Sequence, residues 1–390
     1  DYALRFTPHS FRKWSIFRVS NTALGAISFL VLEVIGGALA VNFGFVNAFW
    51  AILTISLIIF MTSLPISYYA AKYGLDMDLL TRGAGFGYIG STISSFVYAT
   101  FTFILFALEA VIMAYALNMY FGWPIYVWYL ISAVIVIPLV THGVTLISRI
   151  QMITQPIWLF LMVLPFIFIF AKEPDAIRGL MNFAGSSGYD STFNIYMFGT
   201  AIAIGMALIP QVGEQVDFLR FMPEKTQKNR FRWHLGVIFA GPGWIFIGMI
   251  KMFAGVLLAY LVLNGAKSVE EAVNPTYMYH VAFSYVFSNA DVLLAVTVFF
   301  VVLSQIKINI TNAYAGSLAW SNFFARLTHS HPGRVVWLLF NVLIATMLML
   351  LDVFQALEQI LGLYSNIAIS WITAVVADLV INKPLGLSPK

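Results

Sequence analysis

Four ionisable residues lie inside long apolar stretches of the sequence, where a charge is costly and usually has a function. They are Glu33, Glu109, Lys251 and Lys307. A fifth, Glu214, lies near the end of such a stretch. Buried carboxylate and ammonium groups can form a structural pair, line a path for a solute or carry protons. For Glu109 and for Lys251, a structural role in an ion pair and a functional role are equal alternatives. The neighbours of Glu33 and Lys307 favour a functional role for these two residues.

One apolar stretch carries an unusual density of polar residues. Two sets have helical spacing: Ser304, Lys307 and Thr311 at i, i+3 and i+7, and Gln305, Asn309 and Asn312 at i, i+4 and i+7. On a helix these spacings place the polar groups on one broad face. Such a face must contact another helix or line a watery cavity, because lipid offers it no partner. We expect Glu33 to be the counter-charge of Lys307 on this face.

Two places combine polar residues with residues that interrupt helices. Glu33 is followed by Gly36 and Gly37, and adjacent glycines weaken a helix and permit an unwound turn. Pro210 removes a backbone donor just before Gln211 in a second apolar stretch. Broken helices at corresponding positions of two halves point to the binding site of a transporter. Close helix packing at the glycines is the alternative.

The elements that must position these residues are membrane spans. Of the 390 residues, 61% are hydrophobic and 10% are charged, whereas a soluble domain is about 25% charged. Spanning a bilayer takes about 20 apolar residues per helix. Ten stretches qualify, at about 21–43, 46–71, 92–119, 123–141, 146–171, 194–215, 235–264, 290–319, 335–353 and 356–380.

The basic residues predict the orientation of these spans. With ten spans, 16 of the 21 lysines and arginines fall on the side of the N-terminus, three on the other side and two inside spans. Because basic loops stay in the cytoplasm, we expect both termini on the cytoplasmic side of the inner (cytoplasmic) membrane. The predicted parts are a cytoplasmic segment 1–20, a transmembrane core 21–380 with halves at about 21–171 and 194–380, and a cytoplasmic tail 381–390.

Several function classes are excluded or disfavoured. The sequence has no cysteine, which excludes disulfides, thiolate metal sites and a cysteine nucleophile. Neither HExxH nor GxSxG occurs, and the six histidines lack partners at metal-ligand spacing. A net charge of +4 is too small and too scattered for nucleic acid. We expect no enzyme activity, cofactor, metal or nucleic acid; the expected partners are a small solute and the lipid bilayer.

Three motifs resemble those of the nucleobase–cation symporters, the family of purine, cytosine, hydantoin and allantoin permeases. The stretch Arg82–Ser91 resembles the family's RxSFGxxGS signature, with Gly85 in place of the usual Ser. Asp217–Phe221 is similar to its D-[FY]-x-R-[FY] element, and Asn312–Tyr314 to its Asn-centred substrate segment. The resemblance runs from about Phe11 to the C-terminus.

The resemblance implies an all-α polytopic membrane protein with a LeuT-like 5+5 inverted repeat. It also implies a secondary transporter that moves a small polar or heterocyclic, nucleobase-like solute by alternating access. The candidate substrate-binding residues are Glu109, Phe103, Phe106, Gln211, Asn309 and Asn312.

Two positions depart from the family pattern. Relatives that use sodium hold it with carbonyls of the first span and two adjacent hydroxyls of the eighth, where this chain has Ile306 and Lys307. We therefore expect sodium independence, with Lys307 in place of the cation and Glu33 as its partner in a strut or a proton switch. Relatives also clamp the base between aromatic rings. Phe103 and Phe106 could supply the aromatic ring on one side of the base, as an aromatic plate, and the ring on the other side is missing.

A sensor is the alternative function. The sequence also resembles the transporter-shaped membrane module of certain bacterial hybrid sensor histidine kinases. A permanent charge at the cation site and a lost aromatic clamp fit a module that binds a ligand and signals without pumping. In that case cytoplasmic signalling domains, including a kinase, would be fused to or associated with this chain.

Overall fold

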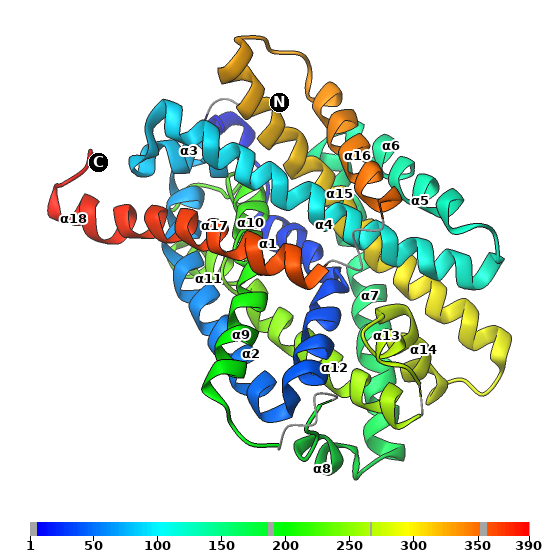
Figure 1. Ribbon diagram of the computed structural model, residues 1–390. Coiled ribbons are helices and arrows are strands. Elements are labelled where there is room, and N and C mark those ends of the chain that lie inside the picture. Colours follow the sequence, from blue (N-terminus) through cyan, green and yellow to red (C-terminus); the bar gives the residue numbers. More distant parts are fainter. Residues whose placement is uncertain (1–5, 186–190, 266, 352–356, 390) are drawn as a thin grey trace.

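The computed structural model describes residues 6–185, 191–265, 267–351 and 357–389, and within them it contains helices and no strand (Figure 1). The longer helices are α1 (Ile16–Gly25), α2 (Val31–Tyr73), α4 (Gly87–Phe121), α5 (Ile125–Val134), α7 (Val144–Lys172), α9 (Ile195–Gly205), α11 (Arg230–Ala240), α12 (Trp244–Asn264), α14 (Pro275–Ser284), α15 (Ala290–Thr328), α16 (Arg334–Leu350) and α17 (Leu357–Ala377). The shorter ones are α3 (Met77–Thr81), α6 (Val136–Thr141), α8 (Ala176–Met181), α10 (Gln211–Leu219), α13 (Val269–Ala272) and α18 (Lys383–Leu385).

The described helices make ten membrane crossings. Seven helical stretches are long and apolar enough to span a bilayer, and the shorter apolar stretches Ile125–Thr141 and Arg334–Leu350 add two. The tenth arises because α2 contains two crossings that meet at Gly44, where φ is 77° and ψ is 163°. Only glycine adopts this conformation without strain. The predicted count of ten is confirmed, and the chain is a multi-pass membrane protein.

Two helix pairs dominate the core and join the two halves of the chain. Helix α15 packs along α4, and α12 packs along α2. The short helix α14 lies against both α12 and α15. In Figure 1 the marked N and C ends both lie in the upper half of the view, whereas α8 lies at the bottom. The polar residues of α15 are buried, so neighbouring helices cover this face and it does not contact lipid.

The adjacent glycines Gly36 and Gly37 lie inside regular helix and not at a break. A Cβ atom at Gly36 would collide with the backbone of Met252, and one at Gly255 with the backbone of Glu33. Small residues permit this close approach of two helices in a membrane. The prediction that these glycines unwind the first span is therefore wrong, and they serve the packing of α2 against α12.

The first span is interrupted just before Glu33. Helix α1 gives way to a 3₁₀ turn, η2 (Ala26–Ser28), and Phe29 is extended with φ −59° and ψ 135°. Helix α2 begins at Val31. Gly25, the last residue of α1, is the one helix-weakening residue at this break, and it lies four residues before the extended Phe29.

The sixth span is interrupted where Pro210 predicts. Helix α9 ends at Gly205, and a 3₁₀ turn, η4 (Met206–Leu208), follows. Pro210 then precedes α10, which begins at Gln211. Each half of the chain thus begins with a broken helix, and the polar groups freed at such breaks need other partners.

Candidate functional site

The break in the first span is closed on one side by the side chain of Lys251. Its ammonium group donates to the carbonyl oxygens of Ile27, Ser28 and Phe29, at 3.2, 3.1 and 2.7 Å. These carbonyls lie where the first half-helix ends, at the partially negative end of its dipole. A buried cation therefore satisfies the polar groups that the break exposes.

Glu33 is the counter-charge of Lys251. Its Oε2 atom lies 3.4 Å from the Lys251 Nζ atom, and the hydroxyl group of Tyr279 on α14 donates to its Oε1 atom at 2.7 Å. The Trp158 ring lies 5.4 Å from the ammonium group, within cation–π range. All four side chains are buried, so the charges depend on each other and on the carbonyls for compensation.

The carboxylate of Glu109 closes the other side of the same break. It accepts the backbone N–H groups of Leu30 and Val31, at 3.2 and 3.3 Å. The first N–H groups of a helix lack helical partners and carry partial positive charge. The amide of Gln305 on α15 lies beside this carboxylate. Glu109 thus caps the second half-helix of the first span.

Lys307 contacts α7 and not the first span. Its ammonium group donates to Gln151 Oε1 at 2.5 Å, to Thr154 Oγ1 at 3.0 Å and to Gln155 Oε1 at 3.0 Å. The Gln151 amide in turn donates to the carbonyl of Lys307 at 2.8 Å. The predicted contact between Lys307 and Glu33 is therefore wrong, because Glu33 pairs with Lys251. The position on the carbonyls of the first span likewise belongs to Lys251.

A second set of polar residues is only half satisfied. Asn312 Nδ2 donates to Asn309 Oδ1 at 3.2 Å, and Gln211 Nε2 donates to Glu214 Oε2 at 2.9 Å. The remaining atoms, Asn309 Nδ2, Asn312 Oδ1, Gln211 Oε1 and Glu214 Oε1, are buried and have no hydrogen-bond partner among the described residues. We call Gln211, Glu214, Asn309 and Asn312 the amide cluster.

The amide cluster belongs to two neighbouring elements. Helix α10, which begins at the break of the sixth span, packs against both α15 and α2. Glu214 is close enough to Glu109 for the two carboxyl groups to interact, and Gln305, on the same stripe as the two asparagines, lies beside Glu109. A buried polar atom without a partner costs about 1–3 kcal/mol, so four such atoms near two helix breaks mark a candidate binding site.

The two phenylalanines predicted as an aromatic plate lie in helix packing. The Phe103 ring stacks on Trp320 of α15, with ring centres 6.1 Å apart and planes at 6°. Phe106 is completely buried in a hydrophobic cluster that includes Tyr314. Their role as a plate for the solute stays a prediction.

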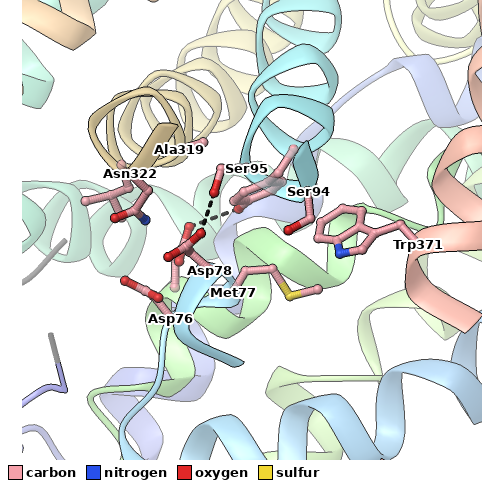
Figure 2. A pocket seen from close by; sticks show the side chains of 11 residues that line it. Asp76, Met77, Asp78, Ser94, Ser95, Ala319, Asn322 and Trp371 are labelled. Atoms are coloured by element: carbon pink, nitrogen blue, oxygen red, sulfur yellow. Dashed lines mark hydrogen bonds between the residues drawn. The ribbon is translucent and has the colours of Figure 1, made fainter. Parts of the chain in front are cut away.

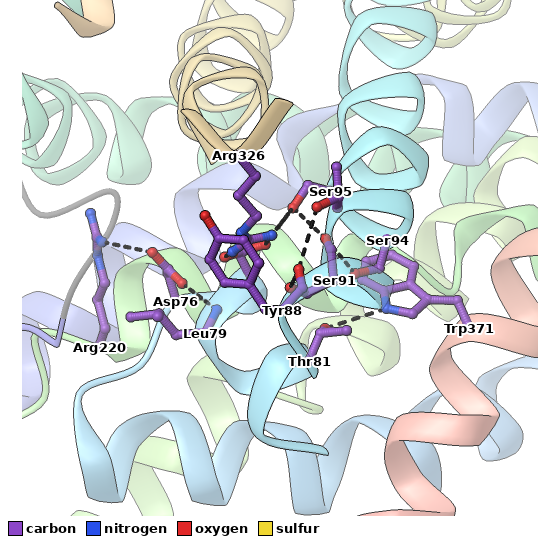
Figure 3. Close-up of polar contacts among 12 residues, drawn as sticks. Asp76, Leu79, Thr81, Tyr88, Ser91, Ser94, Ser95, Arg220, Arg326 and Trp371 are labelled. Atoms are coloured by element: carbon purple, nitrogen blue, oxygen red, sulfur yellow. Dashed lines mark hydrogen bonds and ion pairs between the residues drawn. The ribbon is translucent and has the colours of Figure 1, made fainter. Parts of the chain in front are cut away.

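An ion-pair cluster, which the sequence analysis did not single out, ties α3 and α4 to α15. The guanidinium group of Arg326, which lies close to Ser95 (Figure 3), donates to both carboxylate oxygens of Asp78. The Ser95 hydroxyl donates to the same carboxylate. The side chains of Arg326 and Asp78 are only 6% and 4% exposed. A bidentate pair in this geometry is strong and directional.

The same cluster extends to α10. Arg220 lies 3.6 Å from the Asp76 carboxylate, and its guanidinium group donates to the Tyr314 hydroxyl at 2.8 Å. Tyr98 donates to Asp217 at 2.9 Å. Asp217 and Arg220 belong to the motif Asp217–Phe221, and Tyr314 belongs to the motif Asn312–Tyr314. Both of these motifs therefore contribute to this network. We call Asp76, Asp78, Ser95, Tyr98, Asp217, Arg220, Tyr314 and Arg326 the ion-pair cluster.

A small cavity lies inside the ion-pair cluster. It is lined by Asp76, Asp78, Ser94, Asn322 and Trp371, among others (Figure 2). Its volume is about 10 Å³, which is roughly the least space that one water molecule occupies. This cavity is therefore too small to hold a solute in the structure. The sequence pointed to part of this cluster, since Asp217, Arg220 and Tyr314 lie in the motifs that resemble the symporter family, whereas Arg326 was counted only among the basic residues that predict orientation.

Solved structures share this architecture. The structure of Mhp1, described as a nucleobase-cation-symport-1 family transporter with bromovinylhydantoin bound, has a TM-score of 0.70 and 15% identity, over 98% of this chain and 81% of that chain. A Na⁺-coupled sialic acid symporter has a TM-score of 0.65 and 11% identity, over 95% and 80%. A variant of the Eremococcus coleocola manganese transporter has a TM-score of 0.58 and 15% identity, over 96% and 81%.

These likenesses establish the fold. The protein has the LeuT-like fold with its 5+5 inverted repeat, as predicted. No protein-family model and no curated protein matches the chain by sequence. The three structures named above are transporters, so they give no support to the sensor alternative.

Proposed function

We propose that this protein is a secondary transporter that moves a small polar solute across the cytoplasmic membrane by alternating access. The amide cluster carries the proposal. Its four partnerless atoms lie on α10, which begins at the break of the sixth span, and on α15. Buried polar atoms without partners are costly and rare in folded proteins, and a ligand that bonds to them would offset that cost.

The chemistry of the amide cluster indicates the class of solute. Gln211, Glu214 and Asn312 each present an unused oxygen, and Asn309 presents an unused N–H group. A ligand that matches them carries N–H groups next to a carbonyl group, as ring amides and ureides do. We therefore propose a neutral heterocycle of the nucleobase or hydantoin kind. The hydantoin bound in the Mhp1 structure, which has this arrangement, supports that class.

The ion-pair cluster supplies the closure that alternating access requires. It joins α3 and α4 to α10 and α15 across a cavity of about 10 Å³, too small for a heterocycle. Opening at this end must break contacts such as the one between Arg326 and Asp78. The distribution of basic loops supports placing this end, and both termini, in the cytoplasm.

The experiment that tests the proposal removes the polar atoms in matched pairs. In the double variant Asn309→Leu/Asn312→Leu, the mutual hydrogen bond and both unused atoms disappear together. Replacing both partners by apolar groups of similar shape is nearly neutral or stabilising, so we expect an unchanged or higher melting temperature without ligand. Binding should fall by about 10-fold or more, because each lost bond to a ligand is worth about 1 kcal/mol or more.

The control is Asn366→Leu, which removes an exposed amide on α17. Binding is measured by ligand-induced thermal shift with purines, pyrimidines and hydantoins, and uptake by filtration of proteoliposomes with the same compounds. Normal binding in the double variant would contradict the assignment of the site. Binding without uptake in the unmodified protein would contradict transport and favour a sensor.

A further inference from the structure

Monovalent cations in broken-helix transporters are held by unwound carbonyl groups and helix ends. One of the solved structures with this fold is described as Na⁺-coupled, so the fold raises the question of a cation here. The corresponding oxygens in this protein are the carbonyls of Ile27, Ser28 and Phe29, which already accept the ammonium group of Lys251. These residues do not fit an additional cation, because it would compete for the same oxygens and repel the ammonium group.

We propose that the Lys251 ammonium group is a built-in cation, which takes the place of a dissolved monovalent ion at the broken first span. This proposal adds to the transport function proposed above, since it states that the solute site is assembled without alkali ions. The charge is tethered to α12 and cannot leave with the solute.

Several features show that this arrangement is a complete cation site. Three carbonyl oxygens, the Glu33 carboxylate and the face of Trp158 surround the Lys251 nitrogen atom. The Tyr279 hydroxyl group, on a different element, holds the Glu33 carboxylate through its other oxygen. The ammonium group therefore has negative or partially negative neighbours from three segments of the chain.

The opposite side of the break completes the charge balance. Glu109 accepts the N–H groups of Leu30 and Val31, so a cation caps the carbonyl end and an anion caps the N–H end. These are the charges that the two helix dipoles favour. Both half-helices are thus fixed by side chains of the protein, and neither end depends on an ion from solution.

Lys307 is the natural comparison because it is also a buried lysine of the transmembrane core. Its partners are the neutral side chains of Gln151, Thr154 and Gln155. No backbone carbonyl from the break of the first span and no carboxylate is among these bonds. Removing the Lys307 ammonium group would leave three neutral side-chain oxygens and no carboxylate, so Na⁺ should bind there more weakly than at the break of the first span.

The test compares melting temperatures of purified protein in NaCl, KCl and choline chloride at equal ionic strength. The unmodified protein should melt at the same temperature in all three salts. Lys251→Ser leaves the carbonyls and Glu33 without a cation, so it should melt lower in choline chloride. Saturating Na⁺ should raise its melting temperature by about 5 °C, the effect of an ion that binds only the folded state.

Lys307→Met is the control, because it removes the second buried ammonium group without adding an oxygen ligand. It should recover less in Na⁺ than Lys251→Ser, because it leaves no carboxylate and no helix-end carbonyl without a cation. If Lys251→Ser does not fold, Lys251→Gln is used with the same expectation. A Na⁺-dependent rise for the unmodified protein would overturn the proposal, as would a folded Lys251 variant that ignores Na⁺. The readout needs no solute: failure to bind or take up any heterocycle would defeat the proposed function and leave this contrast intact.

Discussion

The contact between Arg326 and Asp78 offers a direct way to open one end of the molecule. The change is Asp78→Asn, which keeps the size of the side chain and removes its charge. Arg326 would then lose its carboxylate partner in a place where its side chain is only 6% exposed. Breaking a buried ion pair by removing one partner costs about 3–5 kcal/mol.

That cost applies to the closed state, because the guanidinium group can reach water when this end opens. With about 1.4 kcal/mol for each tenfold change in an equilibrium, a loss of about 3 kcal/mol favours the open state by about 100-fold. The absence of cysteine from the chain allows this to be measured without background. Ser94 lines the cavity and is 3% exposed, so Ser94→Cys reports its opening.

The assay is the rate of maleimide labelling of Ser94→Cys in proteoliposomes, with and without Asp78→Asn. We expect slow labelling in the first case and about 100-fold faster labelling, up to the limit of full exposure, in the second. Lys228→Cys, on an exposed loop, should react quickly in both backgrounds. Adding Arg326→Gln to Asp78→Asn removes the unpaired charge and should slow the labelling of Ser94→Cys again.

Two results would refute this reasoning. Labelling of Ser94→Cys within twofold of the original rate would show that the pair does not hold the end closed. Equally fast labelling after the second substitution would show that lost packing, and not an unpaired charge, is responsible.

Two further predictions concern stability. Gly36→Ala should lower the free energy of unfolding by about 1–3 kcal/mol, because the added methyl group would clash with the Met252 backbone. The control Gly199→Ala, at a position with open space, should be neutral or stabilising by up to about 1 kcal/mol. Equal effects of the two changes in urea or thermal melts would contradict the close packing of α2 on α12. Glu109→Ala should lower the free energy of unfolding by about 1–3 kcal/mol, because two buried N–H groups lose their acceptor. Glu109→Gln should lower it less, because its amide oxygen still accepts a hydrogen bond. The reverse order in the same melts would rule out the capping role.

Composition and charge distribution predicted the membrane-spanning fold, because hydropathy and basic loops report directly on the energy of insertion. The broken sixth span was also predictable, since Pro210 lacks the N–H group that a continuous helix needs. The broken first span was misplaced. Its break begins after Gly25 and reaches Phe29 and Leu30, which have no intrinsic tendency to end a helix. The side chains of Glu109 and Lys251 stabilise it from distant parts of the chain.

The partners of the buried charges could not be predicted for a related reason. Helical spacing shows which residues of α15 share a face, but it does not show which neighbouring helix covers that face. Lys307 was assigned to the first span because that assignment satisfied its charge, whereas three neutral groups of α7 satisfy it in the structure. Lys251 stands alone in an apolar stretch, and only the fold brings it to the carbonyls of the break.

Buried charge and unused polarity therefore indicate different things in this protein. Glu33, Glu109, Lys251 and Lys307 have partners on other elements, so the cost of burying them is offset within the protein and they hold the broken helix in shape. In the amide cluster the unused donors and acceptors of Gln211, Asn309 and Asn312 belong to neutral amides, whose desolvation cost per group is lower than that of a charge. A neutral solute can complete such a site without bringing a charge into the membrane. The intramembrane charges thus locate the scaffold of the site, and the unsatisfied amides locate the place where a solute would bind.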